Sequence, residues 1–132
     1  MVDEETLEEI RWRRVEEARL YENYLRYYEE RDFVKASEFL WGSINNLAHA
    51  LGLIYGRRPA GHREIVRFLR ELAETNGREE YRKYVSSAEA LHSNFYHGWM
   101  SEEIFEEGVR EVEELRRWLI ELLDRLTRPF HE

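Results

Sequence analysis

Apolar residues recur at intervals of three and four along nearly the whole chain, and this spacing limits the fold more than any other feature. It matches the period of an amphipathic α-helix, and no segment shows the strict alternation of a half-buried β-strand. The run of Ile44, Leu47, Leu51 and Ile54 is one example. Only two prolines interrupt the 132 residues. The sequence therefore predicts an all-α protein.

Capping residues and glycines divide this pattern into five segments. Asp3, Asp32 and Ser101 each precede a periodic run, and side chains of this kind accept hydrogen bonds from the first free amides of a helix. Gly56 and Gly98 follow such runs, where glycine commonly ends a helix in the left-handed conformation. These signals predict helices over about 4–30, 33–56, 62–75, 79–96 and 102–128.

The length and the short connections indicate how these helices assemble. A chain of 132 residues has the size of a single domain, so we expect one domain over 1–132. Long helices joined by short loops favour an up-and-down bundle. We expect four long helices, with the short helix over 62–75 packed across an end or a side of the bundle.

Composition restricts the class of protein. The chain lacks cysteine, which excludes disulfides, thiolate metal sites and a cysteine nucleophile. No apolar run approaches the roughly 20 residues that cross a bilayer, and the acidic N-terminus lacks a signal-peptide pattern. We expect a cytoplasmic protein with no membrane partner and no cofactor. Dense Glu and Arg on helices favour ion pairs suited to high temperature, so a thermophilic source is expected.

The net charge of −8 disfavours nucleic acid on average but does not exclude a local basic patch. The best phosphate candidate is the stretch from Arg57 to Arg70, because two arginines there precede a predicted helix. Glutamates intersperse this stretch, as they do the other arginine clusters. The alternative is therefore a solvent-exposed, ion-paired face.

The most informative segment for function is 86–99, which holds His92, Asn94, Tyr96 and His97. Histidine can act as a general acid or base near neutral pH, and the Asn and Tyr side chains can donate hydrogen bonds to a phosphate. Five residues apart on a helix, the two histidines lie about 140° from each other. They share a face only if the helix breaks between them. The alternative is that both histidines only stabilise the helix end.

A second polar group lies in the middle of the helix predicted over 33–56. Asn is a poor helix former, so Asn45 and Asn46 are unusual there, and His49 follows them. We expect these residues to reach the region of His92 and Asn94, forming a polar groove that binds a ligand or fixes the helix register.

A metal site is not expected. The residues Glu89-Ala90-Leu91-His92 match the Glu-x-x-His unit of di-metal bundles, but such a site needs a second unit and two more glutamates. The nearest echo, at Asn46 to His49, has Asn in place of Glu.

Aromatic residues indicate an interface. The chain has four tryptophans, and the tyrosines of its first predicted helix cover more than one face. Such residues are enriched where proteins meet, so a homodimer is the simplest way to cover them. The alternative is that one bundle buries them all.

Three stretches carry a resemblance to a known family. They are Phe33 to Ala50, Gly61-His62-Arg63-Glu64-Ile65, and Leu91-His92-Ser93-Asn94-Phe95-Tyr96. Together they resemble the archaeal PaREP family of small paralogous proteins, over roughly residues 15 to 126. That family is similar to the HEPN superfamily of helical bundles, which often dimerise, accompany nucleotidyltransferases and include metal-independent ribonucleases. The resemblance implies a HEPN-like bundle, a homodimer and a nucleotidyltransferase-type partner protein.

The HEPN nuclease motif consists of an Arg, four to six further residues and a His. In this chain His92 stands at the position of the Arg and His97 at that of the His, and the missing Arg argues against nuclease activity. The favoured hypothesis is a non-catalytic interaction module, or one that binds a nucleotide or nucleic acid. The alternative is a diverged, toxin-like ribonuclease that uses His97 and His92.

Overall fold

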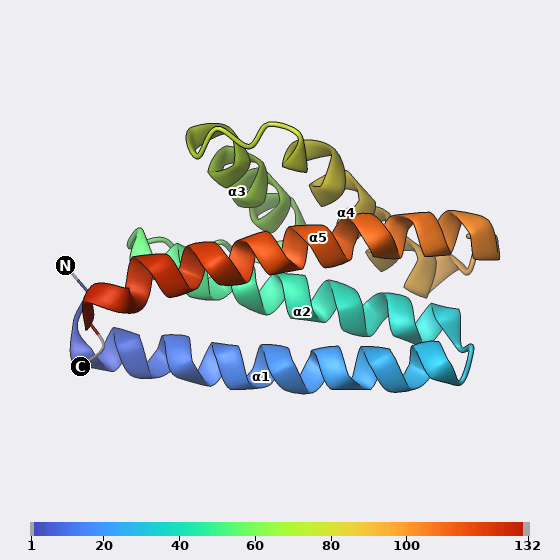
Figure 1. The fold of residues 1–132 in the computed structure, drawn as a ribbon, viewed down its shortest axis with the longest axis horizontal. Coiled ribbons are helices and arrows are strands. Elements are labelled where there is room, and N and C mark those ends of the chain that lie inside the picture. Colours follow the sequence, from blue (N-terminus) through green and yellow to red (C-terminus); the bar gives the residue numbers. More distant parts are fainter. Residues whose placement is uncertain (1, 131–132) are drawn as a thin grey trace.

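The computed structural model describes residues 2–130, except for the side chains of Tyr96 and Phe130. The described residues form helices and no strand, which confirms the all-α prediction (Figure 1). The elements are α1 (Glu4–Glu29), α2 (Phe33–Ile54), α3 (Gly61–Thr75), α4 (Tyr81–His97), α5 (Glu102–Thr127) and a terminal 3-10 turn, η1 (Arg128–Phe130). Within these residues no helix is both long and apolar enough to span a membrane.

The helix ends follow the signals in the sequence. Asp3, Asp32 and Ser101 each accept a hydrogen bond from the amide three residues ahead, at 2.8, 3.2 and 3.2 Å. Gly98 ends α4 in the left-handed conformation, at a φ of 56°. The start of α4 differs from the prediction: it begins at Tyr81 because a turn occupies the residues before it. With 17 residues, α4 is only slightly longer than the 15-residue α3.

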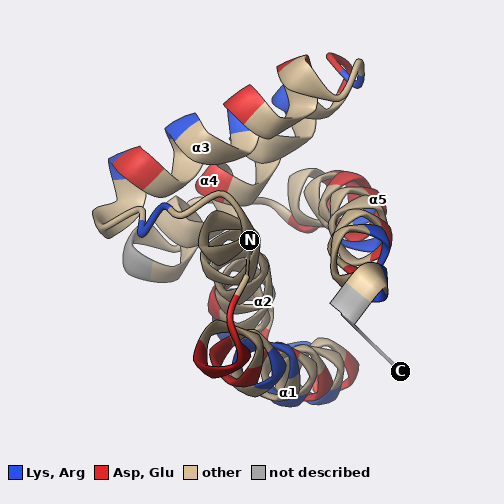
Figure 2. Cartoon of the chain, turned by 90° about the vertical axis from the view of Figure 1, so that its left-hand side faces the viewer, with Lys and Arg blue, Asp and Glu red and all other residues tan. Residues whose placement is uncertain are grey.

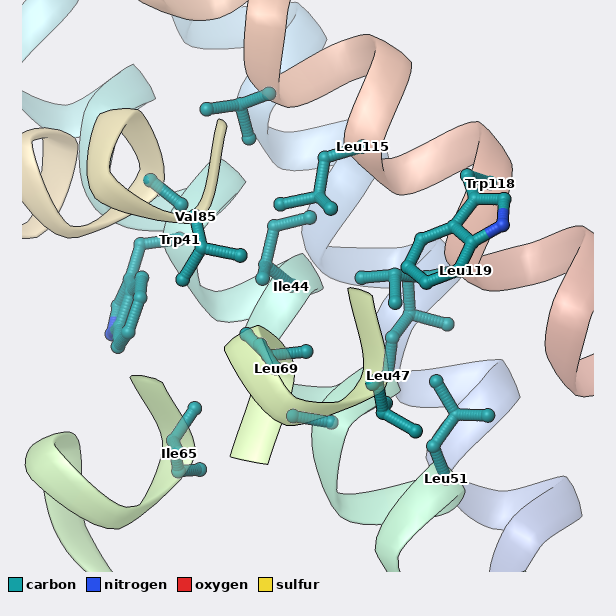
Figure 3. Close-up of a cluster of buried hydrophobic side chains, with 14 of the residues drawn as sticks. Trp41, Ile44, Leu47, Leu51, Ile65, Leu69, Val85, Leu115, Trp118 and Leu119 are labelled. Carbon is teal, nitrogen blue, oxygen red and sulfur yellow. The ribbon is translucent and has the colours of Figure 1, made fainter. Parts of the chain in front are cut away.

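The central element of the fold is α2. It contacts all four other helices, and Figure 2 shows it between α1 and the pair formed by α3 and α4, with α5 beside it. The short helix α3 packs on α4 and α2, at the side of the bundle as predicted. Figure 3 shows Ile44, Leu47 and Leu51 of α2 among apolar side chains of the other helices, including Leu69 and Leu119. Burial of this apolar surface stabilises the assembly.

The helices α1 and α5 are joined by polar side chains rather than by close backbone packing. Glu17 of α1 is 1% exposed, and its Oε2 accepts hydrogen bonds from Ser43 of α2 at 2.6 Å and from Arg116 of α5 at 2.5 Å. The Arg116 guanidinium also lies over the ring of Tyr21, 3.5 Å from its centre. Tyr21 donates a hydrogen bond to Glu113 of α5. One buried carboxylate therefore ties three helices together.

Candidate functional site

Two histidines from different helices lie side by side. His62 stands in the first turn of α3, directly after Gly61, whose φ of 81° turns the chain into the helix. The centre of its ring is 5.0 Å from that of His92 on α4. Trp41 of α2 packs against both rings, with centroid distances of 5.5 and 5.0 Å, and is itself 5% exposed. Trp41 therefore forms a floor beneath the two imidazoles.

Each histidine has a glutamate beside it. The Oε2 atom of Glu89 is 2.7 Å from Nε2 of His62, which is hydrogen-bonding distance. The Oε2 atom of Glu38 is 3.5 Å from Nδ1 of His92, a longer and weaker contact. We call Glu38, Trp41, His62, Glu89 and His92 the histidine cluster.

Burial governs the protonation of two of these groups. It raises the pKa of Glu38 to about 7, because the charged carboxylate loses water without a strong partner to replace it. It also lowers the pKa of His92, and the neighbouring His62 adds to this effect. The cluster therefore holds one carboxyl group, that of Glu38, which titrates near neutral pH.

The histidine cluster opens onto a shallow depression of about 520 Å³. The residues that line it are His62, Ser86, Glu89, Ala90, His92, Ser93, His97 and Trp99. Trp99 is half exposed, and its indole N–H donates to the Ser93 hydroxyl at 3.3 Å. The helix break that would bring His92 and His97 onto one face of α4 does not occur. The helix α4 runs unbroken through His97, and the depression is wide enough to reach both residues.

Arginines cover the surface beside this depression. Residues 57–93 carry eight Lys or Arg and six Glu, whereas the rest of the chain has a net charge of −10. Figure 2 shows basic and acidic positions interspersed along α3. Arg70 donates to the Ser86 hydroxyl at 2.9 Å and lies 3.8 Å from Glu89. Arg63 and Arg67 are exposed, and neither forms an ion pair within the part of the chain that the structure describes. The α3–α4 face is thus locally basic.

The structure does not bring the polar residues of α2 to this depression. Asn46 accepts a hydrogen bond from Arg13 of α1 and donates one to the backbone oxygen of Gly42, both at 3.0 Å. The half-buried His49 has a pKa lowered by burial and, secondarily, by Arg13. Asn45 is half-buried and is not among the residues that line the depression. The expected groove joining this group to the region of His92 is therefore wrong, because Asn46 packs toward α1.

Asn94 is a connecting residue. Its side chain is 2% exposed; the amide nitrogen donates to Ser37 of α2 at 3.0 Å, and the amide oxygen accepts from the Met100 backbone at 2.9 Å. It thus ties the end of α4 to α2 and to the loop that follows. The side chain of Tyr96 lies outside the described residues. Of the four predicted catalytic residues, the structure places His92 and His97 on the depression.

The comparisons with known proteins give one match. The model of the Archaeal PaREP1/PaREP8 family matches residues 13–116. The chain belongs to this family. The match spans the whole histidine cluster and the arginines of α3. No curated protein and no solved structure matches the chain.

Sequence reasoning alone missed His62, Glu38 and Trp41 as part of the site of this PaREP1/PaREP8 family member. They lie on helices other than α4, and only packing brings them to His92. One signal was available: Glu89 and His92, three residues apart on a helix, must share a face. In the sequence this spacing indicates only an incomplete metal-binding unit, and no three His, Cys, Asp or Glu residues of the described chain are placed to hold a metal ion.

Proposed function

We propose that the protein is a binding module for single-stranded nucleic acid, and that the ligand lies on the α3–α4 face. The observation that carries the proposal is the pair of exposed arginines Arg63 and Arg67, which lack acidic partners in the described structure and stand near a depression edged by Trp99. Arginines neutralise phosphates, and exposed aromatic rings stack with bases of any sequence. The α3–α4 face offers both kinds of group.

The length of α4 allows one ligand to contact both the arginines and Trp99. Arg82 and Ser93 are eleven residues apart, which is about 16 Å at the helical rise. A ligand stacked on Trp99 therefore has room to place its backbone beside the arginines. One surface hollow, lined by Arg63, Arg67, Arg70 and Arg82, shares Glu89 with the depression that Trp99 lines. A second hollow, lined by Arg70 and Arg82, shares Ser86 with the same depression.

Fluorescence anisotropy with a labelled single-stranded RNA, measured over a series of salt concentrations, tests the proposal. The variant Arg63→Gln/Arg67→Gln should bind more weakly, and its slope of log affinity against log salt should fall by about 0.7 per lost phosphate contact. The matched control is Arg117→Gln/Arg125→Gln, which removes two exposed arginines of α5. A single-stranded DNA of the same sequence shows whether the sugar matters. Equal losses in both variants, or no binding at low salt, would refute the proposal.

A second candidate function is RNA cleavage of the HEPN type, with His97 as acid or base and His92 in place of the motif's Arg. It is supported by the fact that both side chains line one depression. Purified protein in EDTA should then cleave RNA between about pH 5.5 and 8, the range in which histidine titrates. Activity that persists in His97→Ala would end this assignment.

We also propose a HEPN-like homodimer that works with a nucleotidyltransferase-type partner, as the resemblance implies. The dimer is supported by Trp12 of α1, which is 56% exposed and does not line the depression, whereas Trp41 and Trp118 are buried. Light scattering of the eluting protein gives the mass, and a monomer at all concentrations would contradict the dimer.

A further inference from the structure

A groove lies between the N-terminal half of α1 and the C-terminal end of α5, which are at the same end of the molecule (Figure 1). Both helices pack on α2, but in the described chain they make no close backbone contact with each other. The volume of the groove is about 300 Å³. Sites for small molecules usually measure about 300–1,000 Å³ and are mostly apolar, with a few polar groups that orient the ligand. The groove therefore has the size of a site for a small ligand.

Apolar side chains form most of this groove. Ile10 of α1 and Leu123 of α5 are almost fully buried at its base, and Leu7 is half-buried beside them. Val15 also lines the groove but is 69% exposed, so its methyl groups face water. The hydroxyl of Thr127 donates to the backbone oxygen of Leu123 at 2.8 Å and is thus already satisfied within α5. A ligand that covered these side chains would gain free energy by removing apolar surface from water.

The charged groups that line the groove favour an anion. Arg11 is exposed and forms no ion pair among the described residues. Arg14 lies three residues further along, on the same face of α1, and is paired with Asp124 of α5. That pair is open to solvent, since the two side chains are 35% and 53% exposed. Two cations and one carboxylate give the groove a positive charge in a chain whose net charge is −8.

A side-chain bridge limits the length of the groove. The lining residues of α1 fall within 7–15, which is about 12 Å at the helical rise. Just beyond them, the ion pair between Glu17 and Arg116 joins α1 to α5. A helix of another protein that extended along the groove would meet this bridge, whereas a short alkyl chain ends before it. The dimensions therefore favour a small molecule.

We infer that the groove binds a medium-chain carboxylate. The alkyl chain lies over Ile10 and Leu123, and the carboxylate is bound by Arg11 and Arg14. This site is distinct from the α3–α4 face, because no part of α3 or α4 that the structure describes comes close to α1. The inference is independent of the proposed binding of nucleic acid.

Isothermal titration calorimetry of the purified protein with octanoate tests the inference. Binding should saturate at one site per chain, and the affinity should rise about fourfold with each methylene from hexanoate to octanoate. Octanol has the same alkyl chain without the charge and should bind more weakly. Added salt should weaken the binding of octanoate and have little effect on that of octanol, because salt screens the attraction between charges.

Substitutions then test each part of the site. Arg11→Gln should weaken octanoate binding about three- to tenfold and leave octanol binding unchanged, since only the contact between charges is lost. Asp124→Asn should tighten octanoate binding, because it removes the carboxylate that competes for Arg14. Val15→Glu places a negative charge in the groove and should abolish octanoate binding. The matched control is Leu25→Glu, which changes an exposed apolar residue of the same helix outside the groove and should keep wild-type affinity.

Several outcomes would overturn the inference. They are the absence of saturable binding, equal losses in Val15→Glu and Leu25→Glu, and equal affinities for octanoate and octanol. A dimer that becomes monomeric in Val15→Glu, measured by light scattering, would show that a second copy of the chain covers the groove, and it would also overturn the inference. Circular dichroism checks that each variant folds. Binding of RNA should be unchanged in Val15→Glu, so failure of this site and failure of the proposed function are distinguishable.

Discussion

The buried carboxylate of Glu17 should be among the most stabilising polar groups of the protein. It is 1% exposed and accepts hydrogen bonds from Ser43 and from Arg116, whose side chain is only 16% exposed. The variant Glu17→Gln keeps the shape of the side chain and removes its charge. Arg116 would then be a largely buried cation without a counter-charge, although its contact with the Tyr21 ring would remain.

The size of the effect follows from these contacts. Breaking a buried ion pair costs about 3–5 kcal/mol, and the remaining contact with Tyr21 and the remaining exposure of Arg116 place the estimate near the lower end, at about 3 kcal/mol. The entropy of unfolding is about 2.1 cal/mol/K per residue, which gives about 0.28 kcal/mol/K for 132 residues. The melting temperature should therefore fall by about 11 °C.

Thermal unfolding followed by circular dichroism measures this shift. Glu16→Gln is the matched control, because Glu16 is adjacent on α1 and its partner Arg19 is exposed. This control should melt close to the wild type, since exposed ion pairs contribute little. The double variant Glu17→Gln/Arg116→Met should recover part of the loss, because it removes the uncompensated charge. If Glu17→Gln melts within about 3 °C of the wild type, the ion pair between Glu17 and Arg116 does not stabilise the protein as expected.

Two further predictions concern close packing and pH. In Gly52→Ala the new Cβ would lie 2.8 Å from the backbone oxygen of Arg57, so the free energy of unfolding, measured with denaturant, should fall by about 1–3 kcal/mol. In Gly108→Ala the nearest atom would be 3.9 Å away in mid-helix, so the free energy of unfolding should rise by about 0.5–1 kcal/mol. Equal effects of the two substitutions would contradict the packing argument. Because folding raises the pKa of Glu38 from 4.5 to about 7, Glu38 loses its proton at a lower pH in the unfolded chain than in the folded protein. The wild type should therefore lose stability relative to Glu38→Gln as the pH rises between those two values. The melting temperature of Glu38→Gln should exceed that of the wild type at pH above 7 and match it near pH 4.5, and a difference independent of pH would refute this linkage.

Local features of the sequence were sufficient to place the helices. Asp3, Asp32 and Ser101 cap the helices they were expected to cap, because a cap depends only on residues three or four positions apart. The start of α4 was less accurate, since the sequence around Glu79 is compatible with either a turn or a first helical turn. Boundaries of this kind are decided by contacts with neighbouring helices.

The candidate site was predicted only in part. His92 and His97 were identified from a single segment, and both line the depression. Asn94 and Asn46 were expected to bind a ligand. In the structure each joins helices, because each is hydrogen-bonded to a side chain far away in the sequence, Ser37 and Arg13 respectively. Which partner a buried amide finds depends on helix rotation and register, and these are fixed by packing of the whole bundle.

The sequence by itself determined the helical class, the five helices and the residues at their ends, because helical periodicity and capping are local properties. It also contained the family resemblance that the match over 13–116 confirms. Only the tertiary structure decided that the ring centres of His62 on α3 and His92 on α4 lie 5.0 Å apart, with Trp41 of α2 packed against both rings. Three helices must pack before those rings meet, and the angles at which they pack depend on the shapes of all the side chains between them.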